Sequence, residues 1–106
     1  MVLEAVHLYI RADQSRAFEA AFEQALPLVQ SIEGYVSHEL QRCIEQDNHY
    51  LLLIRWQTLQ DHTEGFRLSP QYQQWKQLLH HFYDPFPNVL HFESVLDDVG
   101  GKNKSG

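Results

Sequence analysis

The sequence predicts an α+β fold with the element order βαββαβ. Segments with the composition of strands occur at residues 2–11, 35–43, 50–56 and 89–96. Apolar residues recur at three- and four-residue spacing between the first two segments and between the last two, which indicates amphipathic helices. The polar turn 45–48 joins the two central strands as a hairpin. This order is the ferredoxin-like plan, in which helices cover one face of an antiparallel sheet.

Composition limits the classes of protein that the chain can be. Its 106 residues, 43% of them hydrophobic and 21% charged, are enough for one domain with its own core. We expect that domain to span 1–96 and a flexible tail to follow at 97–106. A net charge of −6 without a basic run argues against nucleic-acid binding. No signal peptide and no apolar run of about 20 residues are visible, so a cytoplasmic protein without membrane contact is expected.

The first strand is predicted from alternating side chains, and the first helix from apolar residues that recur every three or four positions. Alternation over residues 2–11 directs one set of side chains to one side of the sheet, namely Val6, Leu8 and Ile10. Asp13 is predicted to cap the following helix. The apolar face of that helix consists of Phe18, Ala21, Phe22, Ala25, Leu26 and Val29. Gly34 provides the stop before the second strand.

The second half of the chain begins with the apolar run Tyr50–Ile54, a buried strand that ends at Trp56. Thr58 and Asp61 have nearly the spacing of a capping box, and Pro70 suits the first turn of the next helix. The first of these helices should present Leu59, His62 and Phe66 on one face. The second should bury Tyr72, Trp75, Leu78, Leu79 and Phe82, and a last strand is expected at Val89–Leu96.

The sheet face opposite the helices also carries apolar residues, among them Tyr9, Leu51 and Leu53. Water does not tolerate a large apolar patch, so we expect a second copy of the chain to cover this face. A two-fold homodimer packed sheet to sheet is the simplest arrangement. His7 belongs to this interface, and His91 with Glu93 is expected to form a pair across it.

Four features together resemble the antibiotic biosynthesis monooxygenase family over roughly residues 2–96. They are Trp56, a histidine-bearing helix, the segment Ser69–Tyr72, and the closing strand 91–93. The resemblance implies a dimeric α/β barrel. The family includes cofactor-independent oxygenases of aromatic polyketides and quinols, haem-degrading enzymes, and proteins that act on small signalling molecules.

The sequence departs from the pattern of the haem-degrading relatives. These have an asparagine on the first strand, a tryptophan at the end of the third and a histidine on the last helix. Trp56 matches the second position, but the asparagine position falls on Val6 and the histidine position near Trp75 or Lys76. Other relatives carry a histidine four residues before Pro70.

The residue at that position is Phe66, and His62 lies one turn earlier on the same face. The unperturbed pKa of histidine is near neutrality, so His62 is the candidate base for a phenolic proton. Trp56 is the candidate to stack on a planar aromatic substrate. The alternative is a core anchor for Trp56 and a half-buried packing role for His62. The predicted substrate-binding residues are Phe66, Tyr72, Ile54 and Phe22.

The leading hypothesis is a dimeric, cofactor-independent monooxygenase of a small aromatic or quinol, with neither flavin nor metal. No histidine or acidic spacing fits a metal site, and His49, His80 and His81 are expected to be solvated. Two alternatives stay open. One is a non-enzymatic small-molecule or haem binder, and the other is an isomerase or stress-response protein. Fold alone does not separate them.

Overall fold

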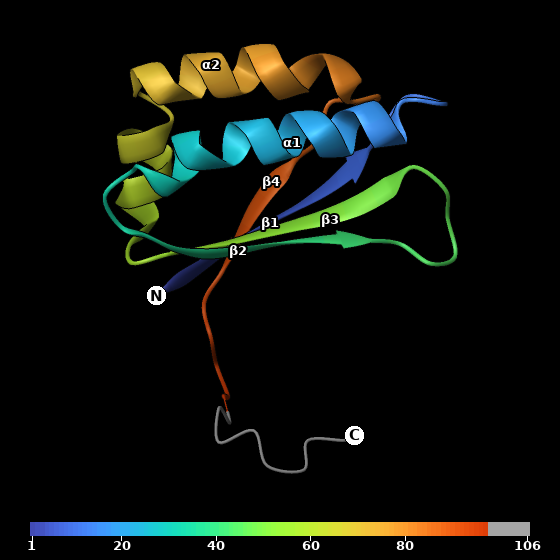
Figure 1. The fold of residues 1–106 in the computed structure, drawn as a ribbon. Helices are drawn as coiled ribbons and strands as arrows, with labels where there is room; N and C mark the ends of the chain where they lie inside the picture. Colours follow the sequence, from blue (N-terminus) through green and yellow to red (C-terminus); the bar gives the residue numbers. More distant parts are fainter. Residues whose placement is uncertain (98–106) are drawn as a thin grey trace.

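The computed structural model describes residues 1–97 and has the predicted element order (Figure 1). In chain order the elements are β1 (Val2–Tyr9), α1 (Ser15–Gln30), β2 (Tyr35–Arg42), β3 (His49–Trp56), the π-helix η1 (Asp61–Phe66), α2 (Pro70–Leu79), the 3₁₀ turn η2 (His80–Phe82) and β4 (Val89–Phe92). The strands form one antiparallel sheet in the order β2-β3-β1-β4. The ferredoxin-like prediction is therefore confirmed. The predicted tail lies outside the described residues, apart from Asp97.

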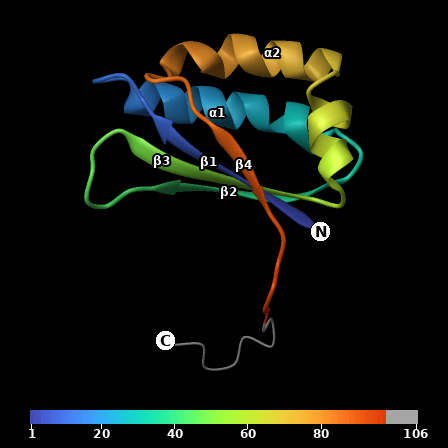
Figure 2. The same ribbon diagram turned by 180° about the vertical axis from the view of Figure 1, so that it is seen from behind.

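Within residues 1–97 the molecule has two layers, with α1 and α2 side by side on one face of the sheet and the other face bare (Figures 1 and 2). Strand alternation produces this arrangement, because every second residue of β1 and β3 faces the helices. Side chains from both layers meet in a single core, which includes Leu8, Phe18, Val29, Ile54, Trp56 and Leu79. Among the described residues no helix is long and apolar enough to cross a bilayer.

Three details differ from the sequence prediction. Asp13 does not cap α1, because it adopts a left-handed φ of 64° and the helix begins two residues later at Ser15. Leu59 is 40% exposed and does not share the buried face of its helix. Strand β4 ends at Phe92 and not at Leu96. Phe92 pairs with Leu3, and β1 starts at Val2. Residues after Phe92 therefore have almost no β1 backbone left to pair with.

Two helix caps fix the segment that later forms one wall of the site. The capping box is confirmed: Thr58 N–H donates to Asp61 Oδ2 over 3.0 Å, and Asp61 N–H donates to Thr58 Oγ1 over 3.2 Å. At the start of α2, Ser69 Oγ accepts from the N–H of Tyr72 over 3.2 Å, and Pro70 occupies the first turn as predicted. The first cap therefore lies at the start of η1 and the second at the start of α2.

Gly34→Ala is expected to lower the free energy of unfolding by more than about 2 kcal/mol. Gly34 has a φ of +92°, which a residue with a Cβ rarely adopts. An added Cβ would also overlap the side chain of Asp61 and force its carboxylate away from the N–H of Thr58. Urea unfolding of the variant and the wild type gives the difference.

Gly65→Ala is the matched control, because the same change meets no obstacle there. A Cβ at Gly65 would lie 3.7 Å from Ile32 Cγ2, which is an ordinary van der Waals contact. Since alanine favours helix, this variant should be more stable by up to about 1 kcal/mol. Equal effects of the two substitutions would contradict the account of Gly34.

Candidate functional site

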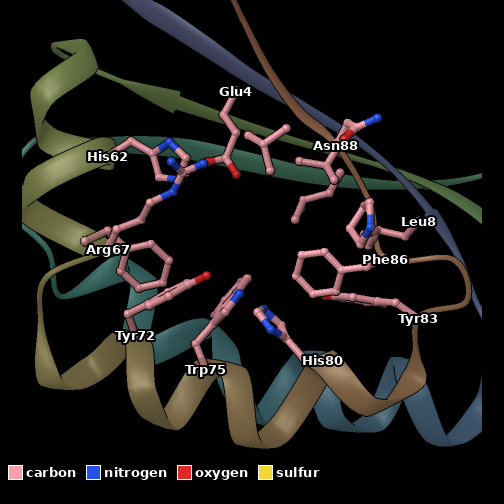
Figure 3. A pocket seen from close by; sticks show the side chains of 15 residues that line it. Glu4, Leu8, His62, Arg67, Tyr72, Trp75, His80, Tyr83, Phe86 and Asn88 are labelled. Atoms are coloured by element: carbon pink, nitrogen blue, oxygen red, sulfur yellow. The ribbon is translucent and has the colours of Figure 1, made fainter.

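A cavity of about 430 Å³ lies between the inner face of the sheet and the helix layer (Figure 3). Its size is that of an ordinary small-molecule site. The lining comes from β1, β3, η1, α2, η2 and the segment that leads into the start of β4. Its members are Glu4, Val6, Leu8, Leu52, His62, Phe66, Arg67, Tyr72, Trp75, His80, Tyr83, Phe86, Pro87, Asn88 and Val89.

Glu4 places a carboxylate at one end of this cavity. It belongs to the inward-facing set of β1 and is 6% exposed. The indole Nε1 of Trp56 donates to Glu4 Oε1 over 2.9 Å. No hydrogen-bond donor within residues 1–97 reaches Oε2, and Figure 3 shows the carboxylate directed into the cavity. A bound ligand would therefore meet an unengaged carboxylate oxygen.

Burial raises the pKa of Glu4 to about 7, because the charged form loses its hydration. The bond from Trp56 and the positive charge of Arg67 act in the opposite direction and lower the pKa, but their effect is smaller. Glu4 therefore exists as both acid and carboxylate near neutral pH. A group of this kind can accept and release protons under physiological conditions.

His62 lies beside Glu4 and is almost fully buried. Its Nε2 is 3.5 Å from Glu4 Oε1, and its Nδ1 is 2.8 Å from His91 Nε2. The ring stacks on Trp56 with 5.4 Å between the centroids. Burial, together with the charges of Arg67 and His91, lowers the pKa of His62 to about 3. His62 is therefore a neutral imidazole at neutral pH.

A neutral His62 has one consistent tautomer. The nitrogen that faces a carboxylate carries the hydrogen, so Nε2–H points at Glu4. Nδ1 then accepts from Nε2–H of His91. Glu4, His62 and His91 form a polar row that connects β1, η1 and β4. Within residues 1–97, no three His, Cys, Asp or Glu side chains are grouped so as to hold a metal ion.

Arg67 reaches the same end of the cavity because of the π-helical turn. Its backbone N–H bonds to the carbonyl of His62 over 3.1 Å, five residues earlier. A turn that closes on the fifth residue brings residue 67 round to the side of residue 62. The guanidinium lines the cavity beside His62 and Glu4 (Figure 3).

Aromatic side chains form the remaining wall. Phe66 contacts Tyr72 and Trp75 edge to face, with centroid distances of 5.2 and 5.5 Å. Tyr83 and Phe86 close the far end (Figure 3). These rings provide flat surfaces against which a planar ligand packs.

His80 also lines the cavity, although the sequence indicated a solvated residue. It lies directly after α2, and its ring contacts Tyr72 and Phe86. Burial lowers its pKa, and so does the charge of Lys76. The prediction was wrong because the segment after η2 folds back over this position.

The predicted site residues divide into two groups. His62, Phe66 and Tyr72 line the cavity, whereas Ile54 and Phe22 are buried in the core outside its lining. Trp56 is likewise fully buried and is not a lining residue. Its indole is committed to Glu4 and His62, so it does not present a face to a ligand in this cavity.

Two other histidines differ from expectation. His49 is half-buried, and its Nε2 is 2.9 Å from His7 Nδ1. His91 bonds to His62 within the same chain, while its expected partner Glu93 is exposed.

Sequence reasoning missed Glu4 and Arg67. For Glu4 the sequence did contain a signal. It alternates in step with the buried Val6 and Leu8, so strand geometry puts all three side chains on the same face.

Comparison with known proteins assigns the chain to a family. The family model described as antibiotic biosynthesis monooxygenase matches residues 1–78. YczJ of Bacillus subtilis, described as uncharacterised, is 53% identical over 95 residues, which are 90% of this chain and all of that protein. The structure of a candidate antibiotic biosynthesis monooxygenase from Bordetella bronchiseptica is 30% identical, with a TM-score of 0.85, over 90% of this chain and 97% of that one.

The fold also matches that of a more distant protein. SnoaB of Streptomyces nogalater, described as a cofactor-independent oxygenase, has a TM-score of 0.79. The two chains are 17% identical over 91% of this chain and 94% of SnoaB. At that identity the likeness concerns the fold alone. The family match and the relatives in Bacillus and Bordetella, by contrast, extend to the sequence, so this chain belongs to the antibiotic biosynthesis monooxygenase family.

Proposed function

We propose that the protein is a cofactor-independent monooxygenase that acts on a small aromatic or quinol substrate. One observation carries the proposal: a buried carboxylate, with one oxygen unengaged, faces a cavity whose walls are aromatic. Family membership and the description of SnoaB as a cofactor-independent oxygenase support the same reaction class.

In this reaction the substrate supplies the electrons. Glu4 removes a proton from a phenolic hydroxyl, and the electron-rich anion reacts with oxygen directly. For a naphthohydroquinone, one molecule of oxygen gives one hydroxynaphthoquinone and one water. Neither flavin nor metal is needed for this balance.

The residues around Glu4 act through it. Trp56 holds Oε1 and thereby aims Oε2 at the cavity. His62 provides an N–H that stabilises the carboxylate form, and His91 fixes the tautomer of His62. Phe66, Tyr72 and Trp75 hold the ring of the substrate. We therefore propose Glu4 as the base, and Trp56 and His62 as positioning residues.

Isotopically labelled oxygen tests the reaction. Purified protein, supplied with naphthohydroquinone and a metal chelator, should consume oxygen and place one labelled atom in the product. His62→Ala should reduce the rate, and the exposed His81→Ala should not. Hydrogen peroxide with an unlabelled quinone would contradict a monooxygenase. Saturable binding without turnover would instead favour a binding protein.

We further propose that a second copy of the chain covers the bare face of the sheet. Leu90 and Phe92 of β4 are 58% and 51% exposed there, beside Ala5 and Leu3 of β1. This apolar surface is of the kind that dimer interfaces bury.

Leu90→Asp should convert the dimer to a monomer, because it places a charge in the proposed interface. The same change at Ile44, which is 94% exposed in the β2–β3 hairpin, is the control and should leave the dimer intact. Sedimentation velocity measures both. A wild-type protein that sediments as a monomer at micromolar concentration would overturn the proposed interface.

A further inference from the structure

Arg67 is a cation without a counterion in the described part of the chain. Three other arginines each have a carboxylate oxygen within 3.5 Å: Arg11 has Asp84, Arg42 has Glu19, and Arg55 has Glu39. Arg67 has no carboxylate within ion-pair distance and no side-chain hydrogen bond among residues 1–97. It nevertheless lines the cavity and is partly buried.

Glu4 does not serve as the missing partner. Among the described residues it is the only carboxylate in the lining, but its Oε1 is held by Trp56 and its oxygens are beyond ion-pair distance from the guanidinium. The backbone of Arg67 is fixed by the π turn, so the side chain approaches the cavity from a defined direction. An oriented, unpaired guanidinium in a concave site is suited to an anion brought by the ligand.

We propose that Arg67 binds a carboxylate of the substrate, which is therefore a hydroxylated aromatic acid. The assignment of its hydroxyl to Glu4 rests on the proposed function, whereas the carboxylate rests on Arg67 alone. The planar guanidinium donates two parallel N–H bonds, a geometry that a carboxylate accepts and a single phenolic oxygen does not.

Figure 3 places Arg67 and Glu4 at the same end of the cavity, with the aromatic rings extending away from them. A ring held by Phe66 and Tyr72 would then present its carboxylate and its hydroxyl together at that end. A carboxylate and a hydroxyl on neighbouring carbons of one ring would lie together in this way. The ligand carboxylate also supplies the charge that Arg67 lacks, so neither ion is buried alone.

Salicylate and salicylamide test this inference, because they differ only in the anionic group. Their affinities are measured by calorimetry at pH 7 in the Glu4→Gln background, where no turnover intervenes. Salicylate should bind at least about tenfold more tightly than salicylamide. Adding Arg67→Gln should remove that preference and leave salicylamide binding unchanged, and adding Arg67→Lys should retain part of it.

Arg42→Gln in the same background is the charge-matched control, since Arg42 lies on the surface beside Glu19. It should keep the preference for salicylate. Equal affinities of the two probes, no salicylate binding by the folded protein, or a preference that survives Arg67→Gln would overturn the inference. A protein that selects salicylate through Arg67 but consumes no oxygen with any quinol would refute the proposed function and leave this inference standing.

Discussion

Glu4→Gln is expected to lower turnover of a quinol by about 100- to 10,000-fold, the range that a positioned general base contributes. The amide keeps the shape of the side chain and still accepts from Trp56, but it cannot take a proton. The wild-type kcat/KM should rise with pH through the pKa of Glu4, about 7, as the carboxylate forms. Oxygen uptake measured across pH gives both results.

Glu23→Gln on the exposed surface of α1 is the control for loss of a carboxylate and should retain full activity. A Glu4→Gln enzyme within a few-fold of the wild type would remove Glu4 from the role of base. So would a wild-type rate that is independent of pH between 5 and 9.

The same substitution should stabilise the fold at alkaline pH. The folded-state pKa of Glu4, about 7, lies above its ordinary value of 4.5. Its contribution to stability is therefore fully present below pH 4.5 and is lost as the pH rises through 7. A shift of this size corresponds to about 3 kcal/mol. Between pH 4 and 8 the unfolding free energy of Glu4→Gln should gain roughly that amount relative to the wild type.

His62 has the opposite effect on how the unfolding free energy changes with pH. Its folded-state pKa, about 3, lies below its ordinary value of 6.5, so its contribution is present above 6.5 and lost as the pH falls toward 3. The wild type should be most stable between pH 4.5 and 6.5, where the two slopes oppose each other. Without the Glu4 slope, the unfolding free energy of Glu4→Gln should rise up to about pH 6.5 and stay at its maximum above that pH. Urea titrations at several pH values measure it, and parallel curves for the two proteins would contradict the raised pKa.

The fold was predictable because its signals are local. The alternation in β1, the helical period of α1, the cap at Thr58 and the proline at the start of α2 each act over a few residues. Asp13 was misassigned because aspartate suits both a helix cap and a left-handed turn residue, and it adopts the turn here. Choosing between these needs the path of the chain from Ile10 to Ser15.

The site was predictable only in part. His62, Phe66 and Tyr72 follow from ordinary helical spacing, and all three line the cavity. Arg67 did not follow, because an α-helical period directs residue 67 away from residue 62, and only the π turn brings them together. Glu4 was detectable in principle, since strand parity puts it on the buried face.

The roles of the other residues depend on tertiary contacts that the sequence does not show. The sequence shows that Trp56 ends a buried strand but not that Glu4 of the neighbouring strand accepts its indole hydrogen. That bond turns Trp56 from a ligand surface into a support for the carboxylate. His80 enters the site only because the segment carrying Phe86 folds back over it.

The pKa of Glu4 itself is the measurement that bears most directly on this mechanism. Carbon NMR of protein labelled at the glutamate side-chain carboxyls follows each group through a pH titration, and Glu4→Gln identifies the signal of Glu4. We expect that signal to titrate near pH 7, well above the ordinary glutamate value of 4.5. A Glu4 signal that titrates near 4.5 would mean that the carboxylate is hydrated, and the proposed base would then lack the property on which its role depends.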